Sequence, residues 1–181
     1  MSASKIRGKI LGALWAAGKP MTLQGIAEKV GLNSSSAMGY LLGLIKAKYV
    51  SVPQKHSYAI TSLGKQALGL PKVDKKLASI ILSPLSMERA FHFYYDINQY
   101  TGVHADSLKD FVDKIQKVDL KSIEFHVPRK DFELWIRSLG DLELSKKMEL
   151  LRMAQLSGEN LRKEVYETVK SRCEELAKLT L

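Results

Sequence analysis

The chain has 181 residues, and its 28 lysine and arginine residues exceed its 19 acidic residues, so its formal charge is +9. With 45% hydrophobic and 26% charged residues, it has the composition of a globular protein, which excludes a disordered or collagen-like polymer. No apolar run reaches the roughly 18 residues of a membrane span. A single cysteine, Cys173, allows neither an internal disulfide nor a cysteine-rich zinc site. We therefore expect a cytoplasmic protein with no membrane partner and no cofactor.

The positive charge is concentrated in the first part of the chain. Residues 1–80 carry 12 lysine or arginine residues and two acids (12 − 2 = +10), whereas residues 81–181 carry 16 and 17 (16 − 17 = −1). Lysines also keep small domains soluble, but solubility alone does not explain why acids are almost absent from the same segment. A field of this sign attracts polyanions, so the first part is expected to bind nucleic acid.

Three helices are expected at the start of the chain. Apolar residues recur at helical spacing from Ile6 to Ala17, and residues 18–20 (Gly-Lys-Pro) end the pattern. Thr22 can cap a second helix, which Gly31 ends. The polar segment 32–36 can cap a third helix. The buried positions expected on this third helix are Ala37, Leu41, Leu44 and Ile45.

A β-hairpin and a fourth helix are expected next. Residues 49–52 and 58–60 have the composition of strands, residues 53–56 that of a turn, and Thr61 can cap a helix through Leu68. In this order of elements, residues 4–70 resemble the winged helix-turn-helix family, most closely in segments 22–27, 34–45, 49–50 and 58–61. The resemblance implies that the third helix enters the DNA major groove and that the wing contacts the backbone or minor groove.

The expected outward face of the third helix is poor in side chains that read bases. Base edges are normally read by Arg, Lys, Asn or Gln, and only Asn33, at the start of the helix, is of this kind. Small residues such as Ser34, Ser35 and Gly39 would allow close approach to DNA. Met38, Tyr40 and Leu42 could instead form an apolar patch for another protein or a second copy of the chain. The sequence leaves both interpretations open.

Basic residues around this helix are better placed to contact phosphates, which position a protein without selecting a sequence. The complete set of expected nucleic-acid-binding residues is Lys5, Arg7, Lys9, Asn33, Ser34, Ser35, Gly39, Lys46, Lys48, Lys55 and His56.

A linker is expected at residues 71–79, followed by a helical domain over residues 80–181. The expected fold is therefore mainly α, with a winged helix-turn-helix of three helices and a β-hairpin wing followed by an α-helical bundle. Nine of the 14 aromatic residues lie between Phe91 and Trp135, which indicates a compact core. Apolar spacing predicts helices over about 107–118, 132–139, 141–153 and 157–176.

Residues 88–176 resemble a poorly characterised domain family of archaea and some bacteria, in places fused to sugar-metabolism enzymes. The resemblance brings no established activity. The matching residues are Ala90-Phe-His-Phe93, Gln99-Tyr-Thr-Gly102, Ser107-Leu108 with Phe111, Ser122-Ile-Glu-Phe-His126, Asp131-Phe132 with Trp135-Ile136, Gly140-Asp141, and Leu161-Arg162 with Arg172.

Two Phe-His pairs raise the question of a catalytic or metal site. His92 and His126, with Glu124, could supply a general base or bind zinc or iron. The spacings are generic, however, and histidines among aromatic residues more often serve as core residues with satisfied ring nitrogens. We therefore expect no catalytic and no metal site.

The function expected from the sequence is non-enzymatic. We expect a nucleic-acid-binding winged-helix protein, active in DNA-linked regulation with little sequence specificity. The first alternative is a ribosome- or RNA-associated factor that acts on rRNA or a ribosomal protein, and this alternative includes action as a homodimer. The second alternative is a ligand- or metal-sensing helical domain.

Overall fold

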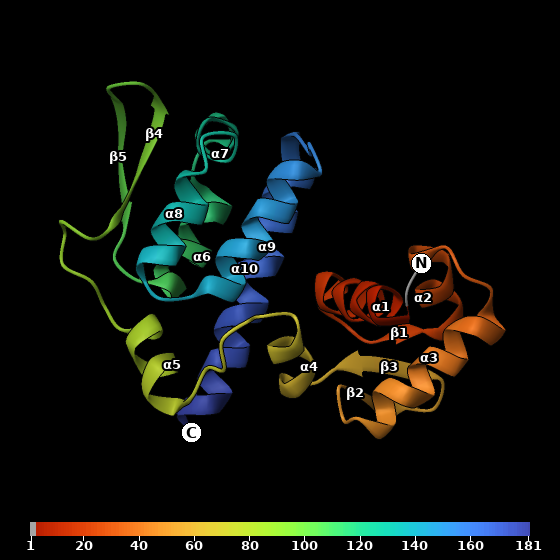
Figure 1. The fold of residues 1–181 in the computed structure, drawn as a ribbon. Coiled ribbons are helices and arrows are strands. Elements are labelled where there is room, and N and C mark those ends of the chain that lie inside the picture. The colour runs from red at the N-terminus through yellow and green to blue at the C-terminus, as the bar shows by residue number, and fades with distance from the viewer. Residues whose placement is uncertain (1–2) are drawn as a thin grey trace. The chain divides into compact units, whose positions relative to one another are not determined.

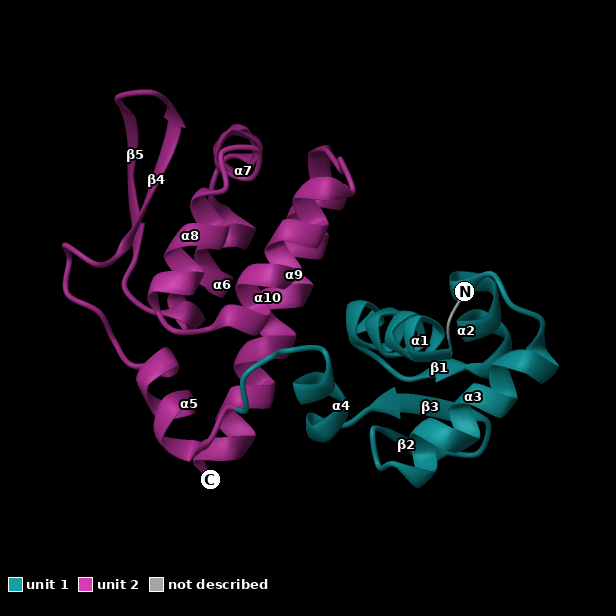
Figure 2. Cartoon of the chain, viewed as in Figure 1, with its two compact units in different colours: residues 1–72 teal, residues 73–181 magenta. Residues whose placement is uncertain are grey.

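The computed structural model describes residues 3–181, which divide into two compact units, residues 1–72 and residues 73–181 (Figure 2). The fold is mostly helical, with a small antiparallel sheet in the first unit (Figure 1). This confirms the expected fold class, a winged helix-turn-helix followed by a helical region. No helix of the described chain is long and apolar enough to cross a membrane.

Unit 1 begins with three helices whose ends are fixed by the residues expected from the sequence. They are α1 (Ala3–Ala17), α2 (Leu23–Val30) and α3 (Ser34–Lys46). The Thr22 side chain accepts a hydrogen bond from the backbone N–H of Gly25 and caps α2. Gly31 ends α2 in the left-handed region at φ 70°, which a glycine adopts without strain.

The sheet of unit 1 has three strands in the order β1-β3-β2. Strands β2 (Val50–Gln54) and β3 (Ser57–Ile60) form the expected hairpin. β1 (Met21–Thr22) pairs with β3 and was not expected, because two residues carry no alternating pattern. Thr61 caps α4 (Ser62–Ala67), as expected.

The core of unit 1 lies between α1, α2, α3 and the sheet. Its buried residues are Ile10, Leu11, Leu14, Ile26, Leu41, Leu44, Val50 and Tyr58. Ile45, which was expected to be buried, is only partly so. Gly64 of α4 lies against the backbone of Tyr49, close enough that a Cβ there would overlap the Tyr49 carbonyl oxygen.

Unit 2 contains six helices and a β-hairpin within its described residues. The helices are α5 (Lys75–Leu82), α6 (Leu108–Lys117), α7 (Leu120–His126), α8 (Asp131–Ser138), α9 (Leu142–Met153) and α10 (Gly158–Thr180). α5 begins inside the stretch 71–79 that was expected to be a linker, and Ala78 is fully buried in the core of this unit.

The hairpin of unit 2 is the main departure from the expected all-helical bundle. Its strands are β4 (Phe91–Asp96) and β5 (Gln99–Ala105), and His92 pairs with His104. Phe91 and Phe93 are buried, while His92 and Tyr94 are less so. This alternation is the period of a strand with one buried face.

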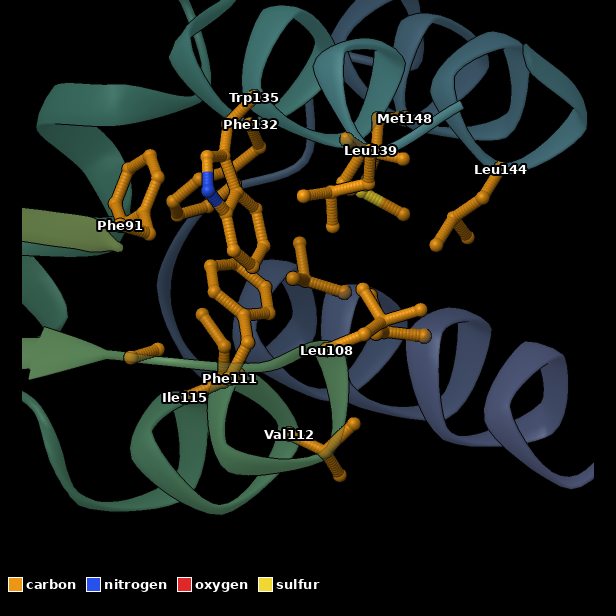
Figure 3. Packing of buried hydrophobic residues seen from close by; sticks show 14 of the residues in the cluster. Phe91, Leu108, Phe111, Val112, Ile115, Phe132, Trp135, Leu139, Leu144 and Met148 are labelled. Carbon is orange, nitrogen blue, oxygen red and sulfur yellow. The ribbon is translucent and has the colours of Figure 1, made fainter. Parts of the chain in front are cut away.

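Aromatic rings form the centre of the unit 2 core (Figure 3). The ring of Phe91 lies 5.5 Å from that of Phe111, 5.1 Å from that of Phe132 and 5.4 Å from that of Trp135, all edge to face. The Trp135 indole N–H donates to the backbone carbonyl of Arg89 at 3.0 Å. The core thus joins the hairpin to α6 and α8.

A buried ion cluster ties α10 to the start of α9. Arg172 donates from Nε to Asp141 Oδ2 at 2.8 Å and from Nη2 to Asp141 Oδ1 at 3.0 Å. Its Nη1 donates to Glu143 at 2.9 Å and to Glu175 at 2.8 Å. Asp141 also caps α9 by accepting from the N–H of Leu144. The two motif segments that contain Asp141 and Arg172 therefore meet in one structural contact.

Candidate nucleic-acid interface

The start of α3 is set by Asn33, the one expected base-reading residue. Its Oδ1 accepts a hydrogen bond from the backbone N–H of Ser36 at 2.8 Å. An N-cap bond of this kind satisfies a helix donor that would otherwise be unpaired. The side-chain oxygen of Asn33 is therefore used to cap α3. Adenine is read by an amide whose oxygen accepts and whose nitrogen donates, so the cap removes the acceptor half of this pattern.

The exposed face of α3 is built from small residues. Ser34, Ser35 and Gly39 are exposed, and a Cβ at Gly39 would have no atom within 4 Å. Leu42 is the one large apolar side chain that is exposed beside them on α3. The rest of this face is low. It can approach another surface closely, and it offers hydroxyl groups in place of bidentate donors.

The three expected protein-contact residues do not form one exposed patch. Met38 and Tyr40 are partly buried and pack against the core of unit 1, whereas Leu42 is 59% exposed. The physical reason is helical spacing, because Met38 and Tyr40 lie on the two flanks of the buried stripe of α3. Leu42 is therefore the one freely exposed apolar side chain among these three.

Basic residues lie at the end of α3 and at the tip of the wing. Lys46 is the last residue of α3, and Lys48 follows in a left-handed turn at φ 62°. Gln54 pairs with Ser57, so Lys55 and His56 form the two-residue turn of the hairpin, with His56 at φ 60°. All four residues are exposed.

Helix α1 adds Lys5, Arg7 and Lys9, all exposed, to the positive charge of unit 1. α1 contacts α3, and the Arg7 guanidinium lies beside Gly43 of α3. The structure thus brings one side chain of α1 to the flank of α3.

The division of charge follows the two units. Residues 1–72 hold ten lysine or arginine residues and one acid (10 − 1 = +9), and residues 73–181 hold 18 of each (18 − 18 = 0). The single acid of unit 1, Glu28, accepts a hydrogen bond from Gln24. Unit 1 therefore carries the whole net charge of the chain with almost no internal compensation.

In unit 2, His126 is the centre of a buried polar chain. Its Nε2 accepts from the backbone N–H of Tyr94 at 2.8 Å, so its Nδ1 carries the proton and donates to Asp131 Oδ2 at 2.7 Å. Burial lowers the pKa of His126, an effect that the hydrogen bond to Asp131 opposes. Arg129 donates to the same Asp131 oxygen at 3.2 Å. Both ring nitrogens of His126 are thus bonded, in the manner of a core histidine.

His92, Glu124 and His126, weighed from the sequence as a catalytic or metal group, each bond to a different partner. The Nε2 of His92 donates to the carbonyl of Met87 at 2.9 Å. The Glu124 carboxylate accepts from the N–H of Gly158 at the start of α10. These side chains point to separate partners because α7 presents Glu124 and His126 on different faces. Among residues 3–181, no group of three or more His, Cys, Asp or Glu side chains is arranged to hold a metal ion.

The sequence pattern did not identify Asp131 as the partner of His126. It lies five residues along the chain, outside the helical steps of three and four, because the backbone turns at Lys130 (φ 67°) between α7 and α8. A pocket of about 380 Å³ lies over this pair, lined on the hairpin side by His92, Tyr94 and Asn98.

The fold of unit 1 is that of a winged helix-turn-helix domain, and the family comparison supports DNA binding by it. Comparison with protein families agrees, because residues 8–53 match the IclR helix-turn-helix domain. Residues 88–179 match a family of unknown function, DUF5752, over just more than half of the chain, and the chain belongs to this family. Searches of curated proteins and of solved structures gave no match.

Proposed function

We propose that this protein is a non-enzymatic, DNA-linked regulator whose unit 1 binds duplex DNA chiefly through its phosphates, with little preference for sequence. The observation that carries the proposal is the exposed face of α3. It presents serines, glycines and Leu42 in place of base-reading side chains, while cations lie around it at Lys46, on the wing and on α1.

Phosphate contacts account for binding of this kind. Each cation that neutralises a phosphate releases a condensed counterion, which favours association without selecting a base. A unit with a charge of +9 and one acid supplies the required field. The small residues of α3 let the backbone of the helix come close to the groove.

Unit 2 has no net charge and does not contribute to this field. We assign to it oligomerisation, recruitment or ligand sensing, with a homodimer as the simplest assembly. In the pocket beside His126, polar and aromatic side chains of unit 2 converge on open space.

The same α3 face favours a second candidate, a ribosome- or RNA-associated factor. Shape and phosphate contacts dominate recognition of double-stranded RNA, so base-reading side chains are not needed there. A basic unit that lacks them suits structured rRNA as a partner.

A salt titration of the full-length chain tests the proposal. Lys46, Lys48 and Lys55 are replaced together by Gln, and affinity is measured on several unrelated duplexes and on one structured RNA. Three lost phosphate contacts at a slope of about 0.9 each reduce the dependence of log affinity on log salt by about 2.7, equally for all duplexes. The control replaces Lys121, Lys163 and Lys178, three exposed lysines of unit 2, by Gln and is expected to keep the wild-type slope.

Two results would change the conclusion. If one duplex binds about a thousandfold more tightly than the rest, as specific regulators do, phosphate-led binding is wrong and an operator exists. If the structured RNA binds far more tightly than every duplex, the RNA-associated function replaces the DNA-linked one.

A further inference from the structure

Arg7 is the single arginine among the ten basic residues of unit 1. Arginine differs from lysine in presenting a planar fork of donors that matches two acceptors at once, whereas the lysine ammonium acts as a point charge. In DNA the matching pair of acceptors is O6 and N7 of guanine in the major groove. Within unit 1, the side chain best suited to read a DNA base therefore comes from α1.

The position of Arg7 places this fork beside α3. Its Nη2 lies 3.8 Å from the point that a Cβ of Gly43 would occupy. Gly43 lies one helical turn after Gly39 on the same side of α3, and neither residue has a side chain that would separate Arg7 from the exposed face. Arg7 is itself exposed.

Few groups within unit 1 compete for the Arg7 fork. Glu28 is the one carboxylate in residues 1–72, and it accepts a hydrogen bond from Gln24. α3 contains no carboxylate, and its exposed residues include Ser35, Gly39 and Leu42. The guanidinium therefore lies next to α3 on an exposed side chain, with no carboxylate of α1 or α3 beside it.

We propose that Arg7 of α1, laid across Gly43 of α3, is the residue that reads guanine and gives the interface its sequence preference. This inference rests on the proposed function, because it requires α3 to face duplex DNA. One bidentate pair discriminates against a wrong base by roughly 5- to 140-fold. That preference is modest compared with an operator-specific regulator and agrees with binding led by phosphates.

The test compares Arg7→Lys and Arg7→Gln with wild type in the full-length chain. Each protein selects from a duplex pool randomised at every position, and the salt dependence of binding is measured on the pool. Wild type is expected to enrich guanine at one position. Arg7→Lys keeps the charge, so it is expected to lose this enrichment and keep the overall affinity and salt slope.

A second pair of variants acts on the position of Arg7 and leaves the residue itself intact. Gly43→Ala places its Cβ at ordinary contact distance from Nη2 and is expected to keep the guanine preference. Gly43→Leu fills the space that the guanidinium occupies and is expected to remove the preference while leaving the salt slope unchanged. Circular dichroism checks that both variants keep the helical fold.

Three results separate the possibilities. Equal guanine enrichment by wild type and Arg7→Lys, with a slope lowered by about 0.9 in Arg7→Gln, makes Arg7 a phosphate contact and overturns the inference alone. Steep salt-dependent binding without guanine enrichment in wild type overturns it as well. Failure of wild type to bind any duplex rejects the proposed function itself.

Discussion

Replacing Arg172 by Met removes the centre of the buried ion cluster. The Arg172 side chain is 2% exposed, and its partners Asp141 and Glu143 are 0% and 4% exposed. Met matches much of the side-chain volume but removes the guanidinium that bonds the two buried carboxylates of Asp141 and Glu143. Breaking a buried pair in this way costs about 3–5 kcal/mol.

The expected change in melting temperature follows from the size of unit 2. Its 109 residues (73–181) give an unfolding entropy of about 0.23 kcal/mol per kelvin at about 2.1 cal/mol/K per residue. A loss of about 3–5 kcal/mol then lowers the melting temperature of unit 2 by about 13–22 °C. Differential scanning calorimetry on the full-length chain measures this shift.

Two controls make the measurement specific to the cluster. Arg137→Met changes an exposed arginine of α8 and is expected to alter stability by less than about 0.5 kcal/mol. Adding Glu143→Gln to Arg172→Met removes one of the two buried carboxylate charges and is expected to recover part of the loss. A loss below about 1 kcal/mol in Arg172→Met, or no recovery in the double variant, would show that the cluster is not a buried network.

Two further predictions concern His126 and Gly64. Burial lowers the pKa of His126 from 6.5 in the folded state, whereas the unfolded chain takes up a proton below that pH. The free energy of unfolding is therefore expected to fall when the pH is lowered from 7.5 to 5.5. It is expected to fall less in His126→Gln. An equal pH dependence in both proteins would contradict this. Gly64→Ala forces a Cβ into the Tyr49 carbonyl and is expected to destabilise unit 1 by about 1–3 kcal/mol in chemical denaturation. Gly39→Ala, which meets open space, is expected to stabilise it by about 0.5–1 kcal/mol; equal effects of the two alanines would reject the steric argument.

Local signals made unit 1 predictable from the sequence. Thr22, Gly31 and Thr61 act at the helix ends through bonds to residues within a few positions, so the chain records them directly. Lys55 and His56 were expected in the wing because the strand-like segments on either side and the short turn between them locate the tip of the hairpin. The flank positions of Met38 and Tyr40 on α3 were harder to judge, because partial burial depends on how closely the neighbouring elements approach.

The fold of unit 2 depends on contacts between residues far apart in the sequence, which no local pattern reveals. The alternation of Phe91, His92 and Phe93 was a signal for a strand, but the density of aromatic residues also suited a helical core. Arg172 meets Asp141 across 31 positions of sequence, and motif order gave no sign of that contact. Arg7 stands out in the sequence as the one arginine of unit 1, but its place beside Gly43 depends on how α1 packs on α3.

The bond between His126 and strand β4 has a consequence for aggregation. A two-stranded sheet has two outer edges, and an open edge is a template onto which a strand of another molecule can pair. On β4 the Tyr94 N–H could donate a hydrogen bond to such a strand, but it already donates to His126 of α7. The histidine thus occupies one donor on the outer edge of β4 from a neighbouring helix. Losing it would leave a polar edge ready for intermolecular pairing, so variants at this position face insolubility during expression as well as reduced stability.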